Sequence, residues 1–147
     1  MDKNGFLIDL SESPRSEFGK VPFAQQSEPQ RVFSCLWAIE SEVNNGGFLQ
    51  YFENDSGETA EFAPWALRTI GAIKMAAIAQ DALSVFLPEK PAPDTDARRD
   101  QLEHLPPEAG EALERLDTAF MAYPDNLTDL LYEFVRSHPD AFGPTPN

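Results

Sequence analysis

Apolar residues recur every three or four positions over most of this chain, which is the spacing of one face of an α-helix. The clearest case is the segment 127–135, where the apolar positions follow one helical stripe: Leu127, Leu130, Leu131, Phe134 and Val135. Segments 32–43 and 63–86 show the same spacing over wider apolar faces. The alternation typical of strands is weak. We therefore predict an all-α fold, a single compact domain of about five to seven helices around a central apolar helix.

The first strong helix has a recognisable start and end. Ser27 can cap it, Pro29 fits the first turn, and Gln30 stands where a capping box requires Glu or Gln. The sequence Asn-Asn-Gly-Gly at 44–47 is predicted to end this helix, because Asn and Gly tolerate the left-handed conformation found there. A short helical segment, 48–52, is expected to follow.

The longest helix is predicted over about 63–86, and its apolar character makes it the candidate for the centre of the fold. Gly71 within it is expected to let another helix approach closely. The Pro-rich stretch 88–96 then predicts an exposed linker. Further helices are expected from Asp94 or Thr95 to about residue 104, over 107–122, and from residue 127 onward.

At 147 residues the chain has the size of one domain. We divide it into an approach segment, 1–26, a helical domain, 27–140, and a flexible tail, 141–147. A short strand or helical turn is expected at Phe6, Leu7, Ile8 and Leu10, and docking on the core is expected of Phe18, Val21 and Phe23.

The charge balance is the strongest global feature. The chain has 25 acidic and 11 basic residues, a net charge of −14. Direct nucleic-acid binding is disfavoured, because phosphate contacts require Lys and Arg. Such a surface attracts basic partners, although acidity also serves solubility alone. The candidate interaction surface consists of acidic residues around the predicted helix 107–122: Asp100, Glu103, Glu108, Glu111, Glu114 and Asp117. The alternative is a solvated helix face.

The single cysteine, Cys35, excludes an intramolecular disulfide and suits a reducing compartment. The N-terminal sequence has no basic segment followed by a long apolar one, as a signal peptide would. No apolar run reaches the length of a membrane span. We expect a soluble cytoplasmic protein without a membrane partner.

Uncharged amides gather around the two adjacent glycines of the segment 42–54. On one interpretation they satisfy backbone groups of a structural turn. On the other they line a small recognition pocket or an enzymatic site. The residues in question are Glu42, Asn45, Gly46, Gly47, Phe48, Gln50, Tyr51 and Asn54.

The sequence shows no reactive centre beside this motif. His104 and His138 stand at predicted helix ends, and neither belongs to a metal-binding spacing. Cys35 lies on an apolar helix face, where thiols are usually inert. The glycine pair lacks the Lys and Ser or Thr of a phosphate loop. We expect no enzymatic activity, no cofactor and no metal.

The block 36–57, followed by Ile-Gly-Ala at 70–72, resembles the C-terminal domain of a bacterial DNA-mimic protein family. The family's pattern of Glu, Asn-Gly-Gly-Phe, Gln, an aromatic pair, Asn and Ser-Gly is matched by Glu42, Asn45, Gly46, Gly47, Phe48, Gln50, Tyr51, Phe52, Asn54, Ser56 and Gly57. The resemblance covers about residues 30–88. Beyond it, only helical pattern and acidity correspond.

The resemblance implies an all-α fold, often a homodimer, whose best-known member presents acidic side chains in place of DNA to a transcription regulator. Our leading hypothesis is accordingly an acidic, non-enzymatic protein that binds a DNA-binding or other basic protein. A ligand or enzymatic site at the glycine motif is one alternative, and a toxin-neutralising protein is another. The motif itself is expected to be the structural signature of the family.

Overall fold

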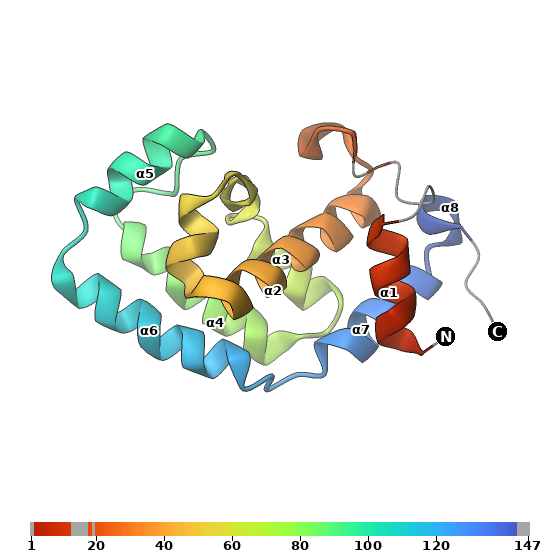
Figure 1. Cartoon of the computed structure of the whole chain (residues 1–147). Helices are drawn as coiled ribbons and strands as arrows, with labels where there is room; N and C mark the ends of the chain where they lie inside the picture. Colours follow the sequence, from red (N-terminus) through yellow and green to blue (C-terminus); the bar gives the residue numbers. More distant parts are fainter. Residues whose placement is uncertain (1, 13–17, 19, 144–147) are drawn as a thin grey trace.

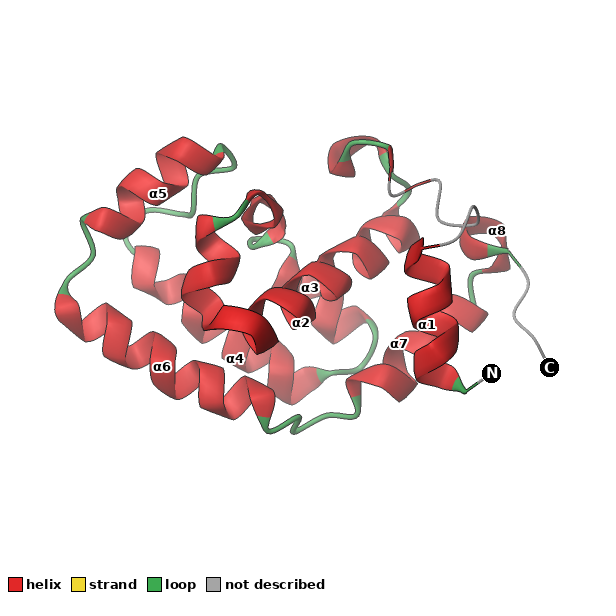
Figure 2. Cartoon of the chain, in the orientation of Figure 1, coloured by secondary structure: helices red, strands yellow, loops and turns green. Residues whose placement is uncertain are grey.

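The computed structural model describes residues 2–12, 18 and 20–143, and helices account for most of them (Figures 1 and 2). No strand occurs among these residues, which confirms the predicted all-α fold. This part of the chain contains eight α-helices, more than expected: α1 (Lys3–Glu12), α2 (Glu28–Glu53), α3 (Ala63–Thr69), α4 (Ile73–Leu83), α5 (Thr95–Glu103), α6 (Pro107–Met121), α7 (Leu127–Arg136) and α8 (Pro139–Phe142). Three short 3-10 helices accompany them: η2 (Phe23–Gln25), η3 (Asp55–Thr59) and η4 (Ser84–Phe86).

Helix α2 is the central element of the fold. It contacts α3, α5, α6, α7 and α8, and in Figure 1 it runs through the middle of the molecule. Its start carries the predicted capping box, in which Gln30 N–H donates to Ser27 Oγ and Ser27 N–H donates to Gln30 Oε1. Its buried face has the predicted helical spacing: Val32, Phe33, Leu36, Ile39 and Val43.

Among the described residues, no helix is long and apolar enough to cross a membrane.

The predicted single helix over 63–86 is wrong. The chain forms α3, turns, and continues as α4 and η4. The start of α4 is held from a distant part of the chain, because the Met75 backbone N–H donates to Asp125 Oδ2 at 2.7 Å. The apolar period continues on both sides of the turn, and periodicity alone therefore did not reveal it.

Gly71 makes this turn. Its φ of +92° lies in the left-handed region that favours glycine. Ala72 N–H donates to Leu67 C=O at 2.8 Å and Gly71 N–H donates to Arg68 C=O at 3.0 Å, the paired bonds of a Schellman C-cap. A Cβ atom added at Gly71 would meet only Leu130 Cδ2, at an ordinary 3.7 Å. Gly71 therefore ends a helix, and its predicted role in close helix packing is wrong.

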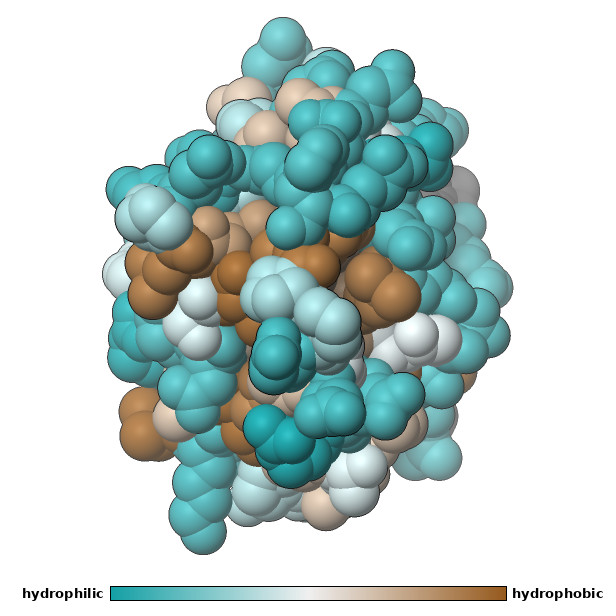
Figure 3. Space-filling view, turned by 90° about the vertical axis from the view of Figure 1, so that its left-hand side faces the viewer, coloured by the Kyte–Doolittle hydropathy of each residue, from teal (hydrophilic) through white to brown (hydrophobic). Residues whose placement is uncertain are grey.

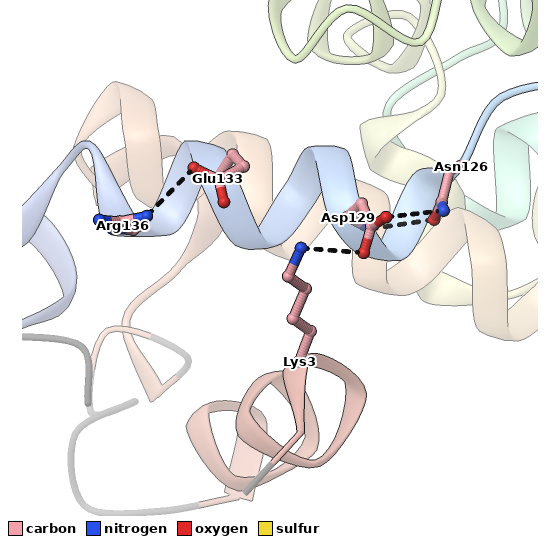
Figure 4. Close-up of polar contacts among 5 residues, drawn as sticks. All are labelled: Lys3, Asn126, Asp129, Glu133 and Arg136. Atoms are coloured by element: carbon pink, nitrogen blue, oxygen red, sulfur yellow. Dashed lines mark hydrogen bonds and ion pairs between the residues drawn. The ribbon is translucent and has the colours of Figure 1, made fainter. Parts of the chain in front are cut away.

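The N-terminal segment forms a helix, so the strand alternative is wrong. Helix α1 packs on α7, with the Phe6 and Tyr132 rings edge to face at 5.6 Å. Lys3 Nζ lies 3.3 Å from Asp129 Oδ1, and Figure 4 shows this ion pair beside Asn126, whose side chain caps α7. Of the three residues expected to dock on the core, Val21 is exposed.

The C-terminal elements follow the sequence closely. Asp94 caps α5 by accepting from Ala97 N–H at 2.9 Å, and α6 and α7 begin where predicted. Residues 139–142 form α8, which the sequence did not indicate. Phe142, which lies within the range predicted as a tail, is buried. Residues 144–147 lie outside the described part, and the proposed domain boundaries stay predictions.

Candidate functional site

The two adjacent glycines put a kink into α2. Gly47 has φ +81° and ψ −179°, a backbone conformation essentially restricted to glycine. The following N–H, that of Phe48, donates to Asp117 Oδ1 of α6 at 2.7 Å. A Cβ atom on Gly47 would lie 2.3 Å from Asp117 Oδ2. Gly47 is thus required both by its conformation and by the carboxylate packed against it. The helix that was predicted to end at 44–47 instead continues beyond this kink to Glu53.

A carboxylate bridges the two sides of the kink. Glu42, which precedes the glycines, accepts through Oε2 from Gln50 Nε2 at 2.9 Å and from Asn54 Nδ2 at 2.8 Å. Asn45 Nδ2 donates in turn to Gln50 Oε1 at 3.2 Å. The structure therefore brings together four of the five polar side chains that the sequence singled out. They bond to one another through their side chains, whereas the structural interpretation of the motif expected them to satisfy backbone groups of the turn.

Tyr51 belongs to a different environment. Its side chain points into the core, where its hydroxyl bonds with Thr59 Oγ1, beside the buried Cys35. Burial raises the pKa of Tyr51 well above its ordinary value, and burial raises the pKa of Cys35 to about 12. Both groups are protonated at neutral pH and neither is an activated nucleophile. The motif residues consequently do not all face one common pocket.

Arg98 of α5 is a buried residue that the sequence did not reveal. Its guanidinium donates to the carbonyl oxygens of Phe52 and Asn54 at the end of α2, and to those of Ala92 and Pro93 in the preceding loop. Its relative exposure is 0%. One cation thereby binds the C-terminal end of the motif helix, where unpaired carbonyls favour positive charge.

Gly57 makes room for this arginine. A Cβ atom there would lie 2.5 Å from Tyr51 O and 2.8 Å from Arg98 Nε. The Ser-Gly that ends the resemblance pattern therefore has a physical reason, which is the close approach of a buried guanidinium. The neighbouring Arg99 is exposed and donates to Glu53 O at 2.7 Å. The polar sequence of α5 does not indicate which of the two arginines is buried.

The predicted acidic surface lies on α5 and α6, along one edge of the molecule (Figure 1). Five of its six members are exposed: Asp100, Glu103, Glu108, Glu111 and Glu114. Across the residues that the structure describes, no Lys or Arg forms an ion pair with any of these five. His104 Nδ1 lies 3.9 Å from Asp100 Oδ1. Figure 3 shows the end of the molecule that includes α5, where hydrophilic side chains surround a smaller apolar area.

Asp117, the sixth member, differs from the others. Its carboxylate is partly buried and turned toward the kink, where it bonds to Phe48. Burial raises the pKa of Asp117, and the hydrogen bond from Phe48 N–H opposes this effect. The row of exposed carboxylates on α6 therefore ends at Glu114.

Comparison with known protein families gives one decisive match. A family model described as DMP19-like protein matches residues 24–138. The chain belongs to this family. The membership confirms the resemblance to the DNA-mimic family, and the match includes α5, α6 and α7, beyond the part that the motif covered. No curated protein and no solved structure matches the chain.

The histidines of this DMP19-like protein serve helix ends. His104 Nδ1 lies 2.7 Å from Asp100 O at the end of α5, and His138 Nδ1 lies 2.7 Å from Phe134 O at the end of α7. The neighbouring carbonyl and the Asp100 carboxylate raise the pKa of His104. The described residues contain no group of three or more His, Cys, Asp or Glu side chains that could hold a metal ion.

Proposed function

We propose that this DMP19-like protein is a non-enzymatic interaction protein that binds a DNA-binding protein by presenting carboxylates in place of phosphates. The observation that carries the proposal is the set of exposed carboxylates on α5 and α6 without Lys or Arg partners in the described chain. Family membership and the net charge of −14 support it. A transcription regulator is the class of partner that we expect first.

The spacing of these carboxylates suits the role. Glu108, Glu111 and Glu114 follow one another every three residues, and such neighbours on a helix lie about 5–6 Å apart. A DNA strand carries one phosphate per about 3.4 Å of helix axis. The α6 row therefore has a charge density of the same order, and the carboxylates of Asp100 and Glu103 on α5 extend it toward the end of the molecule.

The test is affinity capture from native lysate with the full chain, at low and at high salt. We expect a DNA-binding protein that is retained at low salt and released by high salt or by duplex DNA, because ionic contacts are screened and DNA competes for the same surface. A triple variant, Glu108→Gln, Glu111→Gln and Glu114→Gln, is expected to lose the partner.

A second triple variant provides the matched control. Asp9→Asn, Glu61→Gln and Asp81→Asn remove the same number of charges from exposed positions on other elements. This control is expected to retain most of the binding. If the α6 variant retains the partner and the control variant loses it, the interface lies on a part of the chain other than α6. Capture of only salt-insensitive complexes, or of none, would remove the proposal.

The captured protein also decides between regulator and toxin. A toxin without DNA-binding activity, held through the same carboxylates, would favour a neutralising role over DNA mimicry.

Homodimerisation stays a prediction of the family resemblance, which light scattering of the purified chain tests.

A further inference from the structure

A groove of about 190 Å³ lies where α1, α2 and α7 meet, and none of its lining residues belongs to α5 or α6. These helices lie beside one another at the end of the molecule that carries α8 (Figure 1). Polar side chains from all three line the groove: Asn4 of α1, Glu40, Ser41 and Asn44 of α2, and Thr128 of α7. Trp37, Leu7 and Leu131 supply its apolar part.

Glu40 is held in this groove by a specific polar contact. Tyr123 O–H donates to Glu40 Oε1 at 2.9 Å, and Asn44 Nδ2 donates to the Tyr123 hydroxyl at 2.7 Å. Tyr123 has φ +50°, a left-handed conformation that is uncommon for a residue other than glycine. Such conformations persist where the surroundings fix them, and they gather at binding sites. The backbone thus places one phenol against this carboxylate.

The groove presents several hydrogen-bond acceptors. Within the described part of the chain, no Lys, Arg or His side chain forms an ion pair with Glu40. The Asn44 amide uses a hydrogen of its nitrogen on Tyr123, which leaves its oxygen as an acceptor. Ser41 and Thr128 hydroxyls can accept as well. Burial raises the pKa of Glu40, and the hydrogen bond from Tyr123 opposes this. A bound cation would favour the ionised form of this carboxylate.

The size and lining indicate which cation fits. An ammonium group has three donors and no acceptor, which matches a carboxylate surrounded by amide and hydroxyl oxygens. The groove volume of about 190 Å³ is many times the roughly 10–15 Å³ that one water molecule requires on the same measure. This is room for an ammonium group on a short aliphatic chain, whose methylenes can pack beside Leu7 and Trp37.

We propose that this groove binds the ammonium group of a small primary amine or of a lysine side chain, with the Glu40 carboxylate as its counter-ion. Asn44, Ser41 and Thr128 supply further acceptors, and Trp37 contacts the aliphatic part. The site is independent of the acidic surface on α5 and α6, so either can fail without the other.

Trp37 allows a direct test on the full chain. The variant Trp65→Phe leaves Trp37 as the only tryptophan. It is titrated with n-butylammonium chloride, and separately with n-butanol and with sodium chloride at equal ionic strength. We expect a saturable change in Trp37 fluorescence with butylammonium alone. Adding Glu40→Gln is expected to weaken binding at least about tenfold, because the counter-ion is lost. Adding Glu61→Gln, an exposed position outside both proposed sites, is expected to leave binding unchanged.

A second measurement avoids dependence on the tryptophan variant. Amide NMR shifts of the unaltered chain are expected to move around residues 37–44 and 128 on addition of butylammonium. Comparison with Nα-acetyl-lysine methylamide separates the two sources. Equal binding assigns the groove to a lysine side chain, and exclusion of the larger probe assigns it to a free amine. An equal response to butanol, an unaffected Glu40→Gln variant or no saturable response would overturn the proposal.

Discussion

The backbone N–H of Phe48 donates to the Oδ1 atom of Asp117 at 2.7 Å, across 69 positions of sequence. This bond joins the kink of α2 to α6. It divides the acidic residues of α6 into two kinds, since Asp117 holds the fold together while Glu108, Glu111 and Glu114 face solvent. The glycine motif therefore supports the helix that carries the proposed interaction surface.

Replacing Gly47 by alanine is expected to destabilise the protein by at least about 2 kcal/mol, because an unfavourable backbone conformation and a clash with Asp117 act together. Urea denaturation of both proteins measures the difference in free energy of unfolding. Gly110→Ala is the matched control, since no atom lies within 4 Å of a Cβ atom added at this exposed position of α6. That variant is expected to gain roughly 0.5–1 kcal/mol. Equal stability of the Gly47 variant would contradict the structure at the kink.

Asp117→Ala is expected to cost roughly 1–3 kcal/mol, because it leaves the Phe48 N–H without its acceptor. Glu114→Ala, one turn earlier on the exposed face, is expected to remain within about 0.5 kcal/mol of the parent. Thermal or urea unfolding of the two variants side by side tests this. A loss of equal size in both would mean that Asp117 contributes only as part of the helix surface.

The sequence predicted the parts of the fold that rest on local chemistry. The capping box at Ser27 and the Asp94 cap each depend on side chains within a few residues of the backbone group that they serve. The break at the glycine pair follows from the residue type itself, because Gly47 adopts a left-handed φ. Periodicity also predicted α6 and α7 nearly to their ends. Such local preferences are found in the folded chain because the tertiary contacts favour the same local structures.

Long-range contacts explain what the sequence did not predict. The apolar period ran through Gly71, and only the turn geometry there distinguishes a C-cap from a tolerated helical glycine. Arg98 is a charged residue in a polar helix, a type that is almost never fully buried unless paired. Its partners, the carbonyls of Phe52 and Asn54, lie more than 40 positions away in sequence. The sequence singled out polar residues of the motif that lie together in the structure, whereas it did not indicate the buried arginine.

Arg98→Lys is expected to destabilise the protein by roughly 3 kcal/mol, although it keeps the charge. A lysine ammonium lacks the planar arrangement of donors that binds four carbonyl oxygens at once, and hydrogen bonds to charged groups contribute about 1.5–3 kcal/mol each. Arg99→Lys controls for the exchange itself, because Arg99 is exposed, and it should change stability by less than about 0.5 kcal/mol. Calorimetric melting of both variants gives the comparison. A neutral Arg98 variant would show that the carbonyls are satisfied in another way.

Glu40→Gln is expected to stabilise the chain near neutral pH. Burial raises the pKa of Glu40 in the folded state, with the Tyr123 hydrogen bond acting in the opposite direction. Below the ordinary pKa of the group, the folded and unfolded states both hold the proton. As the pH rises through that value, the unfolded chain releases its proton first, so stability falls until the pH passes the raised pKa of the folded state.

Glutamine cannot ionise, and its amide oxygen can still accept from Tyr123. The difference in free energy of unfolding between variant and parent should therefore be larger at about pH 7 than at about pH 4. Urea denaturation at both values measures it in amine-free buffer, with Glu111→Gln as an exposed control that should show no comparable dependence on pH. A Glu40→Gln variant that is less stable than the parent at neutral pH would mean that the ionised carboxylate itself stabilises the folded chain.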